Sequence, residues 1–164
     1  MRPTLMSASG KPRSGRDERG VVAIEFALTV VVFLTLVFGM IQYALYFFSA
    51  QSAADAAREG ARRASVGETC SNLLTRTGDS VRLRETTPAL TVTRRYYAPT
   101  VTNYTAAAAG TAATGKTVVV EVSYNVVDLN FPFIPFVNGG AVTETAVARV
   151  ENYNALVPAK WATC

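Results

Sequence analysis

The hydrophobic positions of this chain form three patterns that follow one another along the sequence. The first is an uncharged run of 23 residues, Phe26–Phe48, in which only Thr29, Thr35 and Gln42 are polar. A helix over this run would be roughly 34 Å long, enough to cross a hydrocarbon core of about 30 Å. Because the run is apolar on every face, it predicts a transmembrane helix. A buried core helix is one alternative. A cleavable secretory signal is another, although its apolar core would span only about 7–15 residues.

The second pattern is amphipathic and continues the helix beyond the apolar run. Five alanines recur at steps of three and four residues and so share one helical face: Ala50, Ala54, Ala57, Ala61 and Ala64. This face is interpreted as the side that packs on a sheet, although alanine is also simply the best helix former. Acidic and basic side chains at i, i+3 and i, i+4 support the exposed side. Gly67 is the expected stop, so we predict one long helix over residues 21–66.

The third pattern is the period-two alternation of β-strands. Val118 to Val126 carries it most clearly, and Leu90–Tyr97 and Ala141–Glu151 are predicted as two further strands. Residues 98–116 are rich in Thr, Ala and Gly and predict a long loop. The sequence therefore predicts an α+β fold. A long N-terminal transmembrane helix continues into a soluble half and packs on a small antiparallel sheet of three or four strands, within a domain of residues 67–164.

A proline-rich apolar segment, Phe131–Phe136, cannot be a central strand because proline lacks the N–H that a sheet requires. Its four large apolar side chains suggest a docking surface or a membrane-facing tip. A loop tucked under the sheet as part of the core explains them equally well.

Charge is concentrated at the N-terminus. The net charge is +4, and residues 1–20 alone hold five basic side chains against two acidic ones. Basic residues beside an apolar span are typical of a membrane-topology signal, and they favour a cytoplasmic N-terminus and an extracytoplasmic C-terminal domain. No basic stripe with interleaved aromatic residues occurs downstream, so nucleic acid is not an expected partner.

Catalytic and metal chemistry find little support in the composition. The chain has no histidine, which excludes Ser–His and Cys–His nucleophile pairs and histidine-containing zinc sites. There is no glycine-rich phosphate loop, and the carboxylates are scattered. We therefore predict a protein that is not an enzyme and needs neither a cofactor nor a metal.

The two cysteines, Cys70 and Cys164, lie just after the predicted helix and at the last position. Outside the cytoplasm two cysteines are more often paired than free, so a disulfide between them is predicted. Two unrelated thiols are the alternative.

One carboxylate stands out, because Glu25 begins the apolar run and ionisable residues in a membrane span are functional candidates by default. An interfacial residue within reach of water is the simpler alternative. Glu25 lies five residues after Gly20, which itself follows the charged residues 16–19.

The segment from Gly20 through Val21 and Glu25 to Phe26 resembles the prepilin-peptidase site of type IV pilin-like proteins. In that family a leader is cut after glycine, and glutamate is the fifth mature residue. The aromatic Phe26 is similar to the variant used by the Tad (tight adherence) pilus. Residues 19–66 as a whole resemble the TadE-like pseudopilins, with Val31 and Gln42 as departures from the family's usual proline and acid.

This resemblance implies a leader of residues 1–20, a membrane span at about residues 26–48 and removal of the leader by a prepilin peptidase. It implies a minor pilin or pseudopilin of a Tad-type (Flp) pilus, held as a single-pass protein in the bacterial inner membrane. Expected partners are membrane lipid, the peptidase, other pilins and the Tad assembly platform, with surface adhesion as the wider role. A type II secretion pseudopilin and an unprocessed membrane-anchored binding domain are the rival interpretations.

Overall fold

The computed structural model describes residues 16–105, 107–131 and 134–164. Most of the predicted leader, residues 1–15, lies outside the described residues, as do residues 132 and 133 of the proline-rich segment. The chain divides into two compact units, residues 1–37 and 38–164, and helix α1 (Arg16–Ser65) runs through the boundary. The predicted long helix is thus confirmed as one continuous element.

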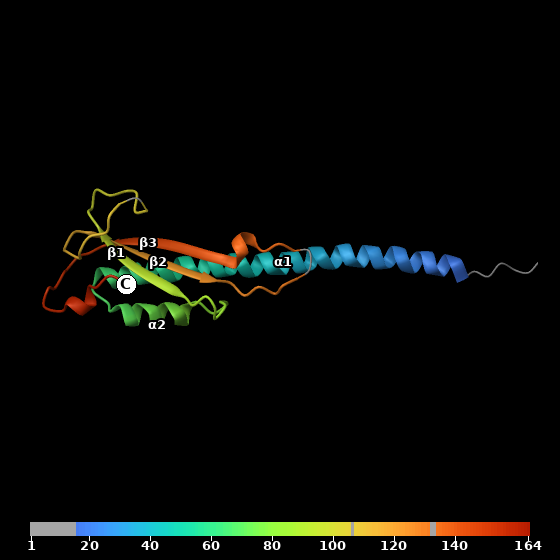
Figure 1. The fold of residues 1–164 in the computed structure, drawn as a ribbon, viewed down its shortest axis with the longest axis horizontal. Coiled ribbons are helices and arrows are strands. Elements are labelled where there is room, and N and C mark those ends of the chain that lie inside the picture. The colour runs from blue at the N-terminus through green and yellow to red at the C-terminus, as the bar shows by residue number, and fades with distance from the viewer. Residues whose placement is uncertain (1–15, 106, 132–133) are drawn as a thin grey trace, which may run out of the picture. The chain divides into compact units, whose positions relative to one another are not determined.

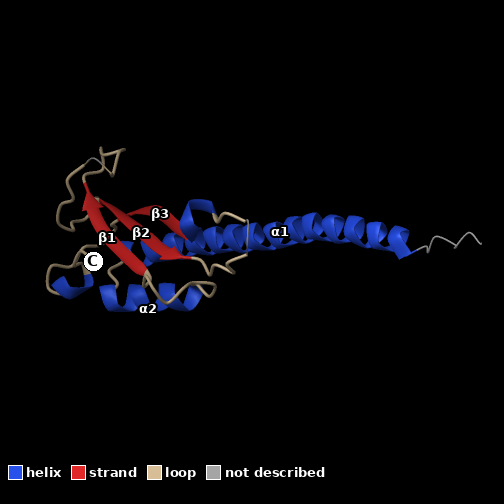
Figure 2. Ribbon diagram, turned by 45° about the vertical axis from the view of Figure 1, so that its right-hand side comes forward, coloured by secondary structure: helices blue, strands red, loops and turns tan. Residues whose placement is uncertain are grey.

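A three-stranded antiparallel sheet forms the centre of the second unit (Figures 1 and 2). Its strands are β1 (Thr91–Tyr97), β2 (Thr117–Asn125) and β3 (Ala141–Arg149), in the order β1-β2-β3. The pairing aligns Arg94 with Val120 and Val120 with Ala146. All three strands occur where the period-two pattern predicts them, so the α+β fold is confirmed.

The C-terminal half of α1 packs on one face of this sheet through small residues. The buried side chains of this face are Ala53, Ala56, Ala57, Ala61 and Ala64. A Cβ on Gly60 would lie 3.2 Å from Val120 Cγ1, so the glycine permits a close approach of α1 to β2. The predicted alanine face is therefore correct from Ala57 onward, whereas Ala50 and Ala54 are only half-buried.

Helix α1 ends where the glycine pattern indicates. Gly67 has a φ of +84°, and a Cβ there would lie 2.7 Å from the Trp161 ring. Only glycine combines this left-handed backbone with so close a contact. The chain then turns into α2 (Cys70–Ser80), an element that the sequence patterns did not predict. Thr69 caps it by accepting a hydrogen bond from the Asn72 N–H, and Leu73 and Thr77, one turn apart, are its buried residues.

Two short 3₁₀ helices complete the second unit, η1 (Val137–Gly140) before β3 and η2 (Pro158–Lys160) near the C-terminus. The described residues between β1 and β2 contain no strand or helix, as expected for the predicted long loop. On the outer face of the sheet, the Tyr97 hydroxyl donates to the Tyr104 carbonyl at 3.0 Å and so holds part of this loop.

Candidate processing and assembly site

The four residues of the predicted processing site lie on α1 and are exposed: Gly20, Val21, Glu25 and Phe26. A Cβ on Gly20 would meet no atom of the chain within 4 Å. Packing within the chain therefore does not explain a glycine at this position. A residue without a side chain leaves its backbone open to a protease and also lowers the cost of unwinding the helix there, by about 1 kcal/mol relative to alanine.

Glu25 lies one helical turn after Val21, on the same side of α1. Its backbone carbonyl accepts a hydrogen bond from the Thr29 hydroxyl at 2.9 Å. None of the ion pairs among the described side chains involves its carboxylate. The carboxylate is therefore exposed and outside these ion pairs.

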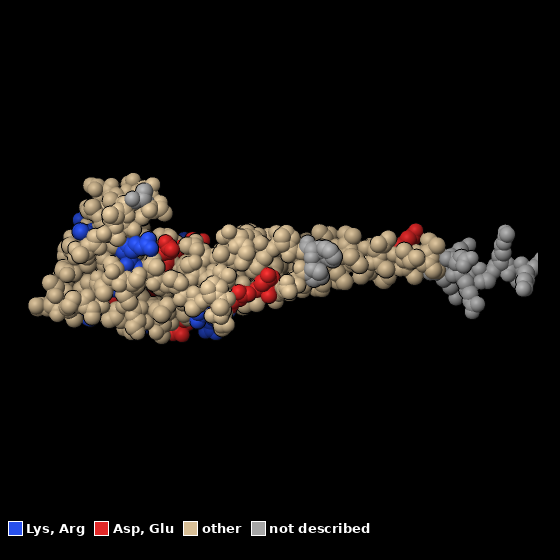
Figure 3. Space-filling model, in the orientation of Figure 1, with Lys and Arg blue, Asp and Glu red and all other residues tan. Residues whose placement is uncertain are grey.

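The part of α1 around this site has the character of a membrane span. The helix from Gly20 to Ser65 is long and apolar enough to cross a membrane, and its most apolar window has no buried residue. Figure 3 shows that charged side chains on the visible face gather over the sheet and α2, while the first part of α1 is almost free of them. Apolar side chains without a protein partner suit contact with lipid or with another helix.

A second group of α1 residues faces the β2–β3 loop. The Phe38 and Phe131 rings stack with centroids 4.6 Å apart, and the Tyr46 and Phe136 rings meet edge to face at 6.1 Å. The proline-rich segment therefore packs against α1 through Phe131 and Phe136, both half-buried. Tyr46 and Phe136 also pack against the buried core of the second unit, so this end of the segment belongs to the edge of the core.

Cys70 and Cys164 form a disulfide, with Cα atoms 5.8 Å apart. The bridge joins the start of α2 to the last residue of the chain, as the cysteine positions predicted. It closes a loop of 94 residues in sequence separation.

Beside the disulfide lies Arg94, a residue that the sequence interpretation did not single out. Its side chain is fully buried. The guanidinium donates to backbone carbonyl oxygens of Glu68, Lys160 and Ala162, and Nη2 lies 3.5 Å from Cys70 Sγ. Burial is the main influence on this group and lowers the pKa of Arg94. One side chain thus holds three backbone segments together around the disulfide.

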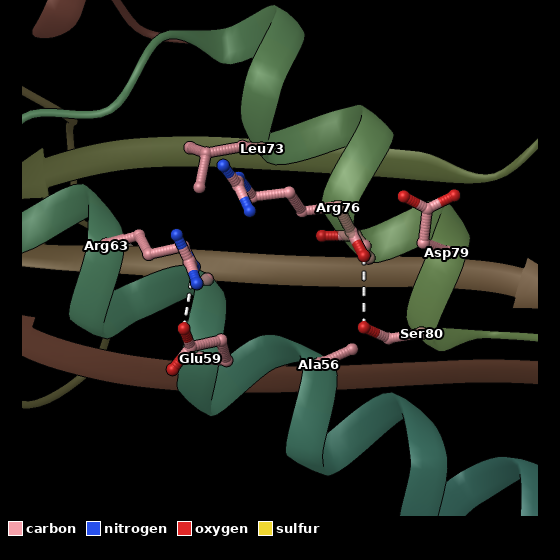
Figure 4. Close-up of a pocket in the computed structure, with 9 residues that line it drawn as sticks. Ala56, Glu59, Arg63, Leu73, Arg76, Asp79 and Ser80 are labelled. Carbon is pink, nitrogen blue, oxygen red and sulfur yellow. Dashed lines mark hydrogen bonds and ion pairs between the residues drawn. The ribbon is translucent and has the colours of Figure 1, made fainter.

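A cavity of about 240 Å³ lies between α1 and α2, lined by Glu59, Arg63, Leu73 and Arg76 among others (Figure 4). Two acidic side chains, Glu59 and Asp79, line it. Glu59 is already engaged, because it pairs with Arg62 at 2.8 Å and with Arg63 at 2.6 Å. The hydrogen bond from Arg62 is the main cause that lowers the pKa of Glu59 to about 2. A carboxylate that stays ionised and paired is a poor general base, so Glu59 is a poor candidate for acid–base chemistry.

Cofactor and metal chemistry have no visible support in the described part of the chain. No group of three or more Cys, Asp or Glu side chains there is arranged to hold a metal ion. Two features distinguish this molecule. One is the mostly exposed apolar part of α1, residues 20–48, in which Glu25 is the single carboxylate. The other is an outer domain whose C-terminus is joined to α2 by the disulfide.

Comparison with known proteins gives one match. Residues 20–62 match the sequence model of a family described as TadE-like protein. The match begins at Gly20 and covers most of α1, and it ends before α2 and the sheet. The resemblance to TadE-like proteins, which form a structural and non-enzymatic family, is confirmed over this segment. No curated protein and no solved structure matches the chain significantly.

Proposed function

We propose, with the TadE-like match of residues 20–62 as the premise, that this chain is a minor pilin or pseudopilin of a Tad-type (Flp) pilus. The observation that carries the proposal is a coincidence of position. The match starts at Gly20, where the sequence changes from the charged residues 16–19 to an apolar stretch. An apolar helix that the rest of its chain does not cover needs lipid or neighbouring helices around it. The helix of a pilin lies in lipid before assembly and packs on neighbouring helices in the filament.

In this proposal a prepilin peptidase cuts between Gly20 and Val21, and α1 then holds the mature chain in the inner membrane. Cleavage gives Val21 a positively charged amine. Moving that amine into a helix bundle of lower dielectric is costly unless an opposite charge is near. Glu25, one turn along the same helix, supplies that charge within its own chain or to the terminus of a neighbour.

The outer domain favours a minor role over a filament-forming one. By family expectation the major Tad pilins are much shorter and almost entirely helical, whereas this chain adds α2, a sheet and a disulfide after residue 67. Such a domain suits a subunit that initiates or caps assembly and contacts the assembly platform, other pilins or a surface.

Processing is tested by the mass of the mature protein. Membrane-extracted protein from cells with an active prepilin peptidase is expected to begin at Val21, and Gly20→Arg to accumulate in the longer form. Gly20→Ala is the matched control, because it keeps the position small and is expected to be cut far more completely than the arginine variant. An intact N-terminus in such cells would refute the pilin assignment and favour an unprocessed membrane-anchored domain.

Assembly is tested at Glu25. Glu25→Gln deletes the charge and keeps the size, so we expect normal membrane levels and normal cleavage but loss of incorporation with partner pilins. Thr29→Val, which changes the next turn of the same face without altering charge, is the control and is expected to assemble. Wild-type co-purification of Glu25→Gln with partner pilins would show that the carboxylate is only interfacial. Assembly that does not depend on the Tad platform would favour a type II secretion pseudopilin.

A further inference from the structure

The length of the apolar helix determines which residues lie at the far edge of the bilayer. A helix needs about twenty residues to cross the hydrocarbon core. Counted from Val21, the first residue after the proposed cleavage site, the twentieth residue is Met40. At 1.5 Å per residue, Phe38 and Gly39 then lie roughly 26–27 Å along the span, just inside its far edge.

The β2–β3 loop contacts α1 at this same level. The Phe131 ring stacks on the Phe38 ring with an interplanar angle of 9°. A Cβ on Gly39 would lie 4.0 Å from Ile134 Cδ1, at ordinary van der Waals distance. A loop that touches these two helix residues shares their depth, so it too reaches the edge of the hydrocarbon.

The backbone of this loop suits a medium with little water. An irregular segment can approach lipid only if its polar groups find partners inside the protein. Prolines 132 and 135 carry no N–H. Of the seven other described N–H groups of the loop, four have acceptors in the chain: Asp128 donates to Glu85 Oε1, Leu129 to Gln42 Oε1, Asn130 to Asp128 Oδ1 and Ile134 to the Phe131 carbonyl.

The surface around the loop is apolar and open. Large exposed side chains occur on the loop and on the neighbouring turns of α1: Met40, Ile41, Phe47, Val127 and Leu129. Tyr43 and Tyr46 add the aromatic residues with polar tips that favour the membrane–water interface. The loop itself carries Asp128 and no basic residue, so its attraction to a bilayer would be apolar and would not require anionic lipid.

We propose that the described residues of the β2–β3 loop, 127–131 and 134–136, form a lipid-contacting collar that seats the outer domain in the interface of the bilayer. The proposal rests on the membrane anchor in the proposed function and places the lipid span at residues 21–40. Lipid is the favoured occupant because a span that begins at Val21 brings the loop to the edge of the hydrocarbon before any partner subunit arrives.

The test measures depth directly. Leu129→Cys, in the full chain with its native disulfide already formed, is labelled with a fluorophore and placed in nanodiscs of brominated phosphatidylcholine. Leu28→Cys reports the anchor. Val147→Cys, an exposed apolar position on β3, is the matched control. The Leu129 label is expected about 15–20 Å from the bilayer centre, the Leu28 label deeper, and the Val147 label beyond reach of the bromines.

The outcomes separate the collar from the anchor. Quenching at Leu28 and Leu129 but not at Val147, unchanged when anionic lipid is added, supports the collar. A Leu129 label that behaves like the Val147 label while Leu28 is quenched would overturn the collar and leave the anchor intact. A Leu129 label shielded only after a second pilin is added would assign this surface to a subunit contact instead. An unquenched Leu28 label would refute the membrane anchor itself. A label at Val127→Cys repeats the measurement if Leu129→Cys fails to fold.

Discussion

Replacing Arg94 tests whether the buried guanidinium makes a net contribution to the stability of the outer domain. Hydrogen bonds from a charged donor contribute about 1.5–3 kcal/mol each, so three carbonyl acceptors give a gross gain of roughly 5–9 kcal/mol. Burying the charge costs several kcal/mol. Arg94→Met keeps the stem of the side chain and removes both terms, so we expect a net loss of about 2–4 kcal/mol in the free energy of unfolding.

Arg94→Lys gives a sharper result than the methionine variant. The ammonium keeps the charge that must be buried, but a single compact group cannot reach three carbonyls on two separate segments as a planar fork does. The lysine variant still bears the cost of burying a charge but loses most of the hydrogen bonds to the carbonyls. It should therefore be less stable than the methionine variant. The predicted order of stability is therefore arginine, then methionine, then lysine.

Urea unfolding in detergent with the disulfide intact would measure these differences. Trp161 is the sole tryptophan, is buried, and lies next to the carbonyls that Arg94 binds, so its fluorescence reports on this region. Arg95→Met is the matched control, since the adjacent arginine is exposed and should change stability by less than about 0.5 kcal/mol. A methionine variant as stable as the wild type, or a lysine variant more stable than methionine, would refute the reasoning.

Two further predictions concern the same domain. In urea unfolding without reductant, Cys70→Ser should have a free energy of unfolding about 4–5 kcal/mol lower than wild type, on the loop-entropy model. Adding reductant to the wild type should lower its free energy of unfolding by a similar amount. Equal stability of the two proteins would contradict a structural role for the disulfide. Tyr124 donates its hydroxyl to the Ser49 carbonyl at 2.6 Å, and burial raises the pKa of Tyr124 to about 12. The phenol of Tyr124 ionises near pH 10 in the unfolded chain. Its contribution to the stability of the folded state is therefore complete below pH 10 and is lost as the pH rises towards 12. The free energy of unfolding of Tyr124→Phe should therefore fall less steeply between these pH values than that of wild type. An equal pH dependence in the two proteins would count against this role for Tyr124.

The parts of the fold that the sequence predicted are those with a repeated apolar pattern. Helix α1 and strand β2 each bury or expose a regular set of side chains, and that regularity is visible in one dimension. Helix α2 was missed for the opposite reason. It buries only Leu73 and Thr77, and its second leucine, Leu74, is exposed, so its apolar residues gave no periodic signal.

Arg94 shows a different limit. The alternation of β1 places position 94 on the inner face with Val92 and Tyr96, so its direction was predictable. Its role was not, because the carbonyls that it binds come from segments remote in sequence. Such a partner set becomes visible only when the fold brings the C-terminal tail and the α1–α2 connection together.

The three polar residues of the apolar run illustrate how the structure distinguishes lipid from protein surroundings. The Thr29 and Thr35 hydroxyls donate to carbonyls one turn earlier on the same helix, which satisfies them without any partner and suits a lipid-facing position. Gln42 cannot be satisfied in this way, because its amide has both donors and acceptors to place. Its side chain is buried, its Oε1 accepts the Leu129 N–H from the β2–β3 loop, and its Nε2 has no partner among the described residues. The glutamine therefore lies, with Phe38 and Gly39, where the β2–β3 loop covers α1, and this position agrees with the proposed lipid span of residues 21–40.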